Sequence, residues 1–436
     1  MVTDKRRRNG VFYTPKLFVD ETHKYIEQAF GENWKDEYVV WDCACGTGNL
    51  TRDYKFKELY MSTLEQSDID TANQMGYNPE AVKFQYDFLN DGVGEDMFDN
   101  SSLPEGLAKA IDEGKKILFL INPPYATAKN GGSSAGNSKA GVAKTKTGER
   151  MLKDGWGGSS QNLYAQFLYN IWKFNESNNN IKIALFCKPL FMSGGSYEAF
   201  RKRFFSSFGF KNGFLFEATH FSDCAKGWGV SFTAIDNVKN NGKFLLDIVD
   251  LDDAFAIQKI GTKEIYNTDG ESLASEWVRK EIKSSKTQDA PPVSSFATVK
   301  ENGNSGLVSG ALGYMNNGGN NVQQNNMMVG IYSSCYANAH GFSIVSENLT
   351  KASALFLARK SITGNWINDK DEYLAPNESH PDYQQFVTDS LVYSLFNNSS
   401  QQSSLRQIEY KGKLWDIKNE FFWLSREEMM EASNGH

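Results

Sequence analysis

The residues best suited to chemistry are Asn122, Pro123, Pro124 and Tyr125, which directly follow the apolar run 117–121. The run predicts a buried strand, and a turn after such a strand presents side chains at the carboxyl edge of a sheet, where open α/β folds bind ligands. An exocyclic amino group on a base is weakly nucleophilic, because its lone pair is delocalised into the ring. The side-chain oxygen of Asn122 and the carbonyl of Pro123 can accept both amino hydrogens, and two consecutive prolines stiffen that pair. The pattern indicates either an acceptor site for such an amino group, with Tyr125 as a flat face for the base, or an ordinary strand-ending turn with a core tyrosine.

A glycine-rich turn follows an earlier apolar stretch, residues 38–41. It reads Asp42-Cys43-Ala44-Cys45-Gly46-Thr47-Gly48. Glycine has no Cβ and adopts positive φ, so a strand that leads into such a turn lets the backbone approach a ligand. The third glycine of the dinucleotide fingerprint is missing, since the pattern ends at Thr51. The turn therefore favours a smaller adenosine-containing ligand over a dinucleotide.

Acidic residues follow the next two predicted strands. Glu65 lies about twenty residues after the glycine turn, the distance at which α/β nucleotide binders place an acid on the ribose hydroxyls. Asp68 and Asp70 are its nearby rivals, although both also suit the first turn of a helix. Asp87 and Phe88 combine a carboxylate, which can bind an adenine amino group, with an apolar face for the ring.

These motifs occur in a fixed order within roughly the first 240 residues. The set comprises Gly10-Val11-Phe12-Tyr13-Thr14-Pro15, Asp42 to Gly48, Glu65, Asp87-Phe88-Leu89 and Asn122 to Tyr125. It resembles the γ group of N6-adenine DNA methyltransferases. The resemblance implies S-adenosylmethionine (SAM) as methyl donor, the N6 amino group of a flipped adenine as acceptor and double-stranded DNA as partner. It also allows a cognate restriction endonuclease within a restriction-modification system.

The resemblance assigns roles to particular residues of this sequence. The residues implied to bind the cofactor are Tyr13, Thr14, Pro15, Asp42, Gly46, Gly48, Glu65, Asp87, Phe88 and Asn122. Asn122, Pro123, Pro124 and Tyr125 are the implied catalytic set. In the family, an aromatic residue of a later loop stacks on the flipped base opposite the motif tyrosine, and here Phe221 is the closest match and Trp228 its rival. No metal is expected, because Cys43 and Cys45 lack a second pair of ligands.

Composition limits the class of protein. With 436 residues, of which 40% are hydrophobic and 13% aromatic, the chain has room for two globular domains. No apolar run is long enough to span a membrane and the N-terminus lacks a signal-peptide core, so we expect a cytoplasmic protein without membrane contact. The five cysteines show no repeated spacing, which suits a reducing compartment. The net charge of −7 does not indicate a nucleic-acid binder, but the range 129–153 holds six basic residues and one acidic residue.

The order of predicted elements indicates an α/β protein with a doubly wound, Rossmann-like sheet, beginning with a helix at 16–30. The resemblance implies that this sheet is that of a SAM methyltransferase. We assign residues 1–245 to this catalytic domain. Within it, the Gly-, Ser- and Lys-rich range of about 126–158 is expected to be a mobile loop that closes over backbone phosphates. Residues 246–436 are expected to form an α+β DNA target-recognition domain, with 316–326 as an exposed loop.

Other acceptors pose the same chemical problem. Asn-Pro-Pro-Tyr also occurs in enzymes that methylate protein glutamine or RNA bases, whereas the N-terminal element and the long C-terminal region favour DNA. Cytosine N4 is a further alternative, for which the first motif residue is more often Ser or Asp. A catalytically silent DNA-binding relative would keep the fold without turnover.

Overall fold

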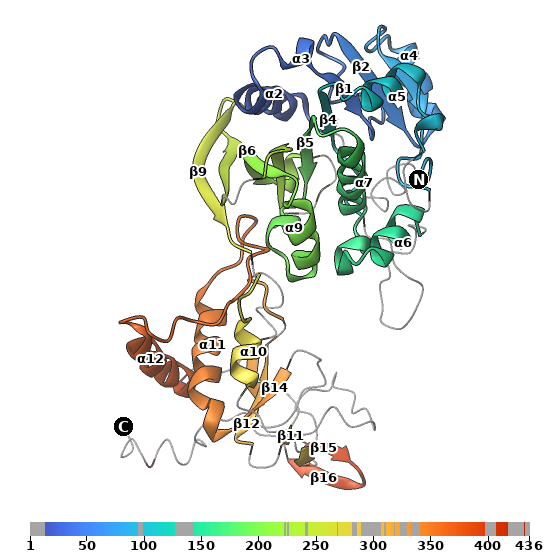
Figure 1. Ribbon diagram of the computed structural model, residues 1–436. Coiled ribbons are helices and arrows are strands. Elements are labelled where there is room, and N and C mark those ends of the chain that lie inside the picture. Colours follow the sequence, from blue (N-terminus) through green and yellow to red (C-terminus); the bar gives the residue numbers. More distant parts are fainter. Residues whose placement is uncertain are drawn as a thin grey trace. The chain divides into compact units, whose positions relative to one another are not determined.

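The chain divides into two compact units, Met1–Asn267 and Thr268–His436. Each unit contains its own sheet and its own helices (Figure 1), as expected for a chain of this length. The computed structural model describes residues 14–94, 99–126, 144–221, 224, 226–239, 243–267, 269–280, 286–288, 307–308, 311–317, 319–322, 329–332, 341–396, 407–416 and 431.

Over the described residues, the first unit is built on a nine-stranded sheet with the order β3-β2-β1-β4-β5-β7-β6-β8-β9. Its parallel strands are β3 (Val82–Gln85), β2 (Glu58–Thr63), β1 (Val39–Asp42), β4 (Ile117–Ile121) and β5 (Ile181–Cys187). Strands β2 and β3 lie on one side of β1, and β4 and β5 lie on the other. Such a reversal of strand order is a switch point, where α/β sheets bind ligands beyond the carboxyl ends of the strands. Every residue of β1 and β4 is buried, as their apolar sequences predict.

The remaining strands extend this sheet. Strand β7 (Gly229–Asp236) runs antiparallel between β5 and β6 (Gly209–Glu217). Strand β8 (Phe244–Leu251) then pairs in parallel with β6, and β9 (Ile257–Ile265) pairs with β8. The domain boundary expected after residue 245 therefore falls inside β8, and the division between the two units comes later, after Asn267.

Helices cover both faces of the sheet, because right-handed crossovers change sides where the strand order reverses. They are α2 (Lys16–Phe30), α3 (Trp34–Glu37), α4 (Gln66–Gln74), α5 (Glu105–Asp112), α6 (Lys146–Lys153), α7 (Leu163–Ser177), α8 (Leu190–Ser193) and α9 (Glu198–Phe204). Helix α2 contacts β6 and β7, whereas α7 contacts β5. The predicted doubly wound α/β fold and the helix at 16–30 are confirmed.

Part of the range predicted to be a loop is helical. Residues 146–153 form α6, and the prediction of a structureless stretch over about 126–158 is wrong there. The side chain of Thr145 caps the helix by accepting a hydrogen bond from the Gly148 amide at 2.9 Å, and Thr147 and Met151, four residues apart, are buried. Residues 127–143 of that range, which carry two of its basic residues, lie outside the described residues.

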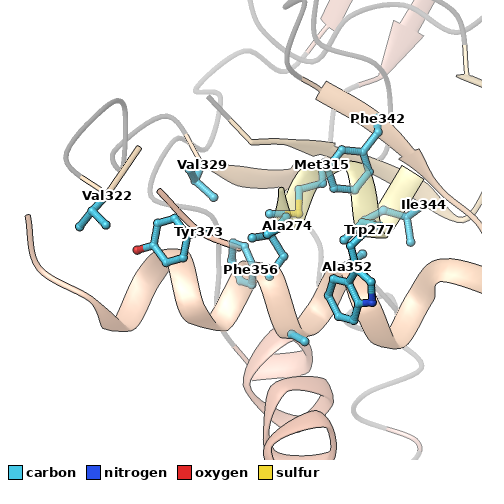
Figure 2. Close-up of a cluster of buried hydrophobic side chains, with 13 residues drawn as sticks. Ala274, Trp277, Met315, Val322, Val329, Phe342, Ile344, Ala352, Phe356 and Tyr373 are labelled. Carbon is cyan, nitrogen blue, oxygen red and sulfur yellow. The ribbon is translucent and has the colours of Figure 1, made fainter. Parts of the chain in front are cut away.

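The second unit is a smaller α+β structure. Its strands are β10 (Lys286–Gln288), β11 (Leu307–Val308), β12 (Gly313–Asn316), β13 (Gly330–Tyr332), β14 (Gly341–Ile344), β15 (Gln407–Tyr410) and β16 (Lys413–Asp416), and its helices are α10 (Ala274–Arg279), α11 (Leu349–Ser361) and α12 (Tyr383–Phe396). Strand β12 lies between β13 and β14 in an antiparallel sheet. Figure 2 shows its core, in which Met315, Phe342 and Ile344 of this sheet pack with Trp277 of α10 and Phe356 of α11.

The expectation of an exposed loop over 316–326 is wrong at its start. Asn316 belongs to β12 and Asn317 follows it, and both side chains are fully buried. The polar composition of the range suggested exposure, but Asn316 is part of the sheet and pairs with Gly330 of β13 and Gly341 of β14. Residues 323–326 of the range lie outside the described residues.

Candidate active site

The Asn122 side chain is held at the carboxyl end of β4 by two hydrogen bonds. Its amide nitrogen Nδ2 donates to the Thr14 hydroxyl at 2.9 Å, and its Oδ1 accepts a hydrogen bond from the Tyr125 hydroxyl at 2.7 Å. Because the two ends of the amide have different partners, its orientation is fixed. Asn122 thus presents an acceptor oxygen at the switch point of the sheet.

Tyr125 is buried next to an aromatic and cationic pair. Burial raises the pKa of its hydroxyl well above the ordinary value, so the hydroxyl stays protonated and remains a donor to Asn122. The Trp228 ring lies edge to face with Tyr125, with centroids 6.3 Å apart and an interplanar angle of 89°. The Lys188 ammonium lies 5.1 Å from the centroid of the Trp228 ring. We call Tyr125, Lys188 and Trp228 the acceptor patch.

A cavity of about 370 Å³ includes Asn122 and Pro124 in its lining but none of the residues of the acceptor patch. We refer to the cavity side and the acceptor side of the Asn122 turn in this sense. The cavity is lined by the segments that follow β1, β2, β3 and β4, together with the residues that precede α6 and the first turns of α7. Its lining residues are Cys43, Ala44, Gly46, Thr63, Leu64, Glu65, Asp68, Tyr86, Asp87, Phe88, Leu89, Asn90, Asn122, Pro124, Lys144, Thr145, Leu163 and Phe167. Six residues predicted from the sequence therefore meet in one cavity: Gly46, Glu65, Asp87, Phe88, Asn122 and Pro124.

The two glycines of the first turn have different surroundings. Gly46 has φ +49° and lines the cavity, and a Cβ added there would meet no atom within 4 Å. Gly48 has φ +87° and lies outside the cavity lining, and a Cβ there would come within 2.7 Å of the Met61 side chain. Gly46 is therefore placed to let a ligand approach the backbone, whereas Gly48 allows close packing on β2.

Asp42 shapes the turn rather than lining the cavity. The carboxyl group is fully buried, and its Oδ1 accepts a hydrogen bond from the Ala44 amide at 3.3 Å. Its Oδ2 has no hydrogen-bond partner among the described residues, and burial raises the pKa of the carboxyl to about 8. At neutral pH the proton-bearing form of Asp42 is therefore favoured.

The acids of the cavity differ in how firmly they are held. Asp87 accepts hydrogen bonds from the Leu89 amide at 3.1 Å and from the Asn90 side chain at 2.7 Å, so its carboxylate closes the turn after β3. Glu65 is exposed at the start of α4, where its long side chain can reach a ligand. Asp68, its sequence rival, lines the same cavity.

Two cavity walls come from residues that sequence reasoning missed. Phe167 of α7 stacks on Phe88 with ring centroids 5.0 Å apart and an interplanar angle of 17°, and Leu163 lies one turn earlier. The helical spacing of these apolar residues indicates only a core face, since an apolar side chain buried by protein or by a ligand gives the same pattern. Lys144 and Thr145 lie within the range that is expected to be a loop. A threonine before an amphipathic turn is nevertheless a signal for the start of a helix.

A buried polar network fixes the wall formed by the turn after β3. Thr147 donates to the Leu89 carbonyl from its amide at 3.1 Å and from its hydroxyl at 2.8 Å. Asn170 of α7 donates to the Phe88 carbonyl at 2.6 Å and to the Thr147 hydroxyl at 2.9 Å. Both side chains have no exposed surface. Helices α6 and α7 therefore hold the Phe88–Leu89 backbone against the cavity.

The structure does not place Phe221 beside Tyr125 as an accessible stacking face. Phe221 is 1% exposed and packs in the core, with ring centroids 6.4 Å from Phe186 and 5.4 Å from Phe216. Its sequence rival Trp228 is half-buried and contacts Tyr125. Phe221 therefore has no open face, whereas Trp228 is placed against Tyr125, and its role as the stacking aromatic is part of the function proposed below.

The N-terminal element is only partly described. Tyr13 lies outside the described residues. Thr14 orients Asn122, and the Pro15 carbonyl begins α2 by accepting hydrogen bonds from the Phe18 and Val19 amides at 3.0 and 3.2 Å. Thr14 and Pro15, predicted to bind the cofactor, do not line the cavity.

Across the described ranges, no cluster of three or more His, Cys, Asp or Glu side chains is arranged to hold a metal ion. In the same part of the chain, each helix is too short or too polar to span a bilayer.

Comparison with known proteins finds similarity at the level of solved structures. No family model and no curated protein matches the chain. A DrdV–DNA complex is 18% identical, over 56% of this chain and 28% of that chain, with a TM-score of 0.40. The type IIL restriction-modification enzyme MmeI in complex with DNA is 12% identical, over 74% of this chain and 46% of that chain, with a TM-score of 0.38.

A Pyrococcus horikoshii protein described as an RNA methyltransferase is 12% identical, over 53% of this chain and 88% of that chain, with a TM-score of 0.30. The chain thus spans about a quarter of the DrdV chain and about half of the MmeI chain. These similarities do not assign an activity to the chain.

Proposed function

We propose that this protein transfers a methyl group from SAM to the N6 amino group of a flipped adenine in double-stranded DNA. The observation that supports this most is the position of Asn122, whose amide is oriented by Thr14 and Tyr125 at the rim of the cavity. The proposal includes DNA target recognition by the second unit, Thr268–His436.

The cavity fits the cofactor in size and in chemistry. A volume of about 370 Å³ lies within the usual range of small-molecule sites. Glu65 would hold the ribose hydroxyls and Asp87 the adenine amino group, while Phe88 and Phe167 supply an apolar wall. When bound, SAM supplies a methyl group on a positively charged sulfonium, which is already activated for transfer.

The residues of the turn act by orienting the acceptor. Asn122 Oδ1 and the Pro123 carbonyl would each accept one hydrogen of the amino group, which favours a pyramidal nitrogen with an available lone pair. Tyr125 holds the Asn122 oxygen in place, and Trp228 offers the aromatic surface for the flipped base. The amino proton then leaves to water.

Nucleoside mass spectrometry tests the proposal directly. Unmethylated DNA is incubated with SAM and with the intact protein, the Asn122→Ala variant or the Asn73→Ala variant, which changes an exposed asparagine of α4 as a matched control. We expect N6-methyldeoxyadenosine with the intact protein and the control, and a rate about 10²–10³-fold lower with Asn122→Ala, because an oriented hydrogen-bond acceptor is lost.

The same experiment separates the alternatives. N4-methyldeoxycytidine in place of N6-methyldeoxyadenosine would show that the acceptor base is wrong. Methylation confined to RNA or to protein glutamine in parallel incubations would show that the polymer is wrong. SAM binding without methylation of any acceptor would indicate a catalytically silent relative.

A further inference from the structure

The acceptor patch is assembled by three neighbouring strands of the sheet. Tyr125 follows β4, Lys188 directly follows β5, and Trp228 directly precedes β7. Strand β5 pairs with β4 on one side, through Leu185 and Ile121, and with β7 on the other. The three side chains therefore meet because their strands are adjacent, although 103 residues separate Tyr125 from Trp228 in the sequence.

Hydrogen bonds to the backbone fix the segments that carry the patch. The Ala218 amide donates to the Trp228 carbonyl at 3.0 Å, and the Gly227 amide donates to the Glu217 carboxylate at 3.1 Å. The Ser231 hydroxyl donates to the Cys187 carbonyl at 3.0 Å, which ties the start of β7 to the end of β5. Trp228 and the residue next to Lys188 are thus anchored on regular structure rather than on a free loop.

The composition of the patch discriminates between acceptors. Lys188 lies with its ammonium 5.1 Å from the Trp228 ring centroid, and both side chains are half-buried. A nucleotide combines an aromatic base with an anionic phosphate, whereas a glutamine side chain has neither. The Trp228 ring and the Lys188 ammonium, which lie beside the Asn122 turn, are therefore complementary to the base and the phosphate of a nucleotide.

We infer that Lys188 contacts a backbone phosphate of the DNA strand that carries the target base, with Trp228 holding the ammonium in position. This inference rests on the proposed function and extends it. It names a residue whose contact with phosphate would select a nucleic acid as the acceptor. Lys188 is a binding residue in this role and takes no part in the methyl transfer itself.

Salt dependence of DNA binding tests the inference. The affinity for a duplex containing the mapped methylation site is measured at several salt concentrations for the intact protein, Lys188→Gln, Lys188→Arg and Lys211→Gln. Lys211 lies on β6 and is exposed, so its variant is the matched control for loss of one positive charge. Each phosphate contact contributes about 0.9 to the slope of log affinity against log salt concentration.

We expect the slope to fall by about 0.9 for Lys188→Gln and to stay unchanged for Lys188→Arg and Lys211→Gln, with unchanged SAM affinity in all variants. A slope for Lys188→Gln equal to that of the intact protein, with SAM affinity retained, would overturn the inference and leave the proposed function standing. If Lys188→Gln does not fold, Lys188→Met, which keeps the aliphatic stem over Trp228 and removes the charge, is measured in its place. An intact protein that methylates glutamine and does not bind the duplex would instead refute the proposed function.

Discussion

The two sides of the Asn122 turn are built in different ways. On the cavity side, Thr147 and Asn170 are fully buried and bind the backbone of the Phe88–Leu89 turn, so the wall is fixed by hydrogen bonds. On the acceptor side, Lys188 and Trp228 are half-buried side chains in a cation–π contact. Under the proposed function this difference is expected, because the donor is one small molecule of constant shape, whereas the acceptor is a polymer that must enter and leave.

The largest expected effect is a loss of stability in a variant of the core, in contrast to a loss of DNA binding in a variant of the acceptor side. Phe221→Ala removes a ring packed against Phe186 and Phe216 and should lower the free energy of unfolding by about 3–5 kcal/mol. Trp228→Ala removes a half-buried ring and should weaken binding of the flipped base by about 1–3 kcal/mol. Urea unfolding and kcat/KM for DNA, measured on both variants, give the two quantities.

The assignment of the stacking aromatic would be contradicted by a Trp228→Ala variant with full activity. It would also be contradicted by a stable Phe221→Ala variant that has lost activity on DNA. Unchanged SAM affinity in Trp228→Ala serves as the control, because Trp228 does not line the cavity.

A smaller effect is expected on the cavity side. Asn170→Ala leaves the Phe88 carbonyl without its 2.6 Å hydrogen bond, and an unsatisfied buried polar group costs about 1–3 kcal/mol. Because the affected turn also lines the cavity, KM for SAM should rise, while KM for DNA stays close to that of the intact protein. Thermal unfolding and calorimetric SAM titration measure the two effects. A variant with lower DNA affinity and unchanged SAM affinity would show that the network does not act on the cavity.

The sequence predicts the cavity side better than the acceptor side. Apolar runs followed by polar or glycine turns place Gly46, Glu65, Asp87 and Asn122 at the ends of adjacent parallel strands, and the cavity brings them together. Local patterns do not reveal which of two aromatics in one loop turns inward, because that depends on contacts with strands distant in sequence. The family pattern therefore favours Phe221, although the folded chain buries Phe221 and places Trp228 against Tyr125.

The missed elements have similar physical causes. Helix α6 is short, and only Thr147 and Met151 are buried among its Lys, Gly, Glu and Arg residues, so its period is hard to detect. Strands β8 and β9 belong to the first unit through the pairing of β8 with β6, a non-local contact that composition does not encode. The expected domain boundary at 245 followed a change in composition instead.

The smallest expected effect tests how the two sides are joined at Asn122. Tyr125→Phe removes the hydroxyl that donates to Asn122 Oδ1 at 2.7 Å and keeps the ring beside Trp228. A single hydrogen bond contributes about 0.5–1.5 kcal/mol, so kcat should fall by about 2- to 12-fold. SAM affinity should be unchanged, since Tyr125 does not line the cavity, and DNA affinity should be unchanged, since the ring remains. Single-turnover methylation with both affinities measured in parallel checks this.

An equal fall in DNA affinity would mean that the hydroxyl binds the acceptor itself, whereas an unchanged kcat would mean that Thr14 alone suffices to orient Asn122.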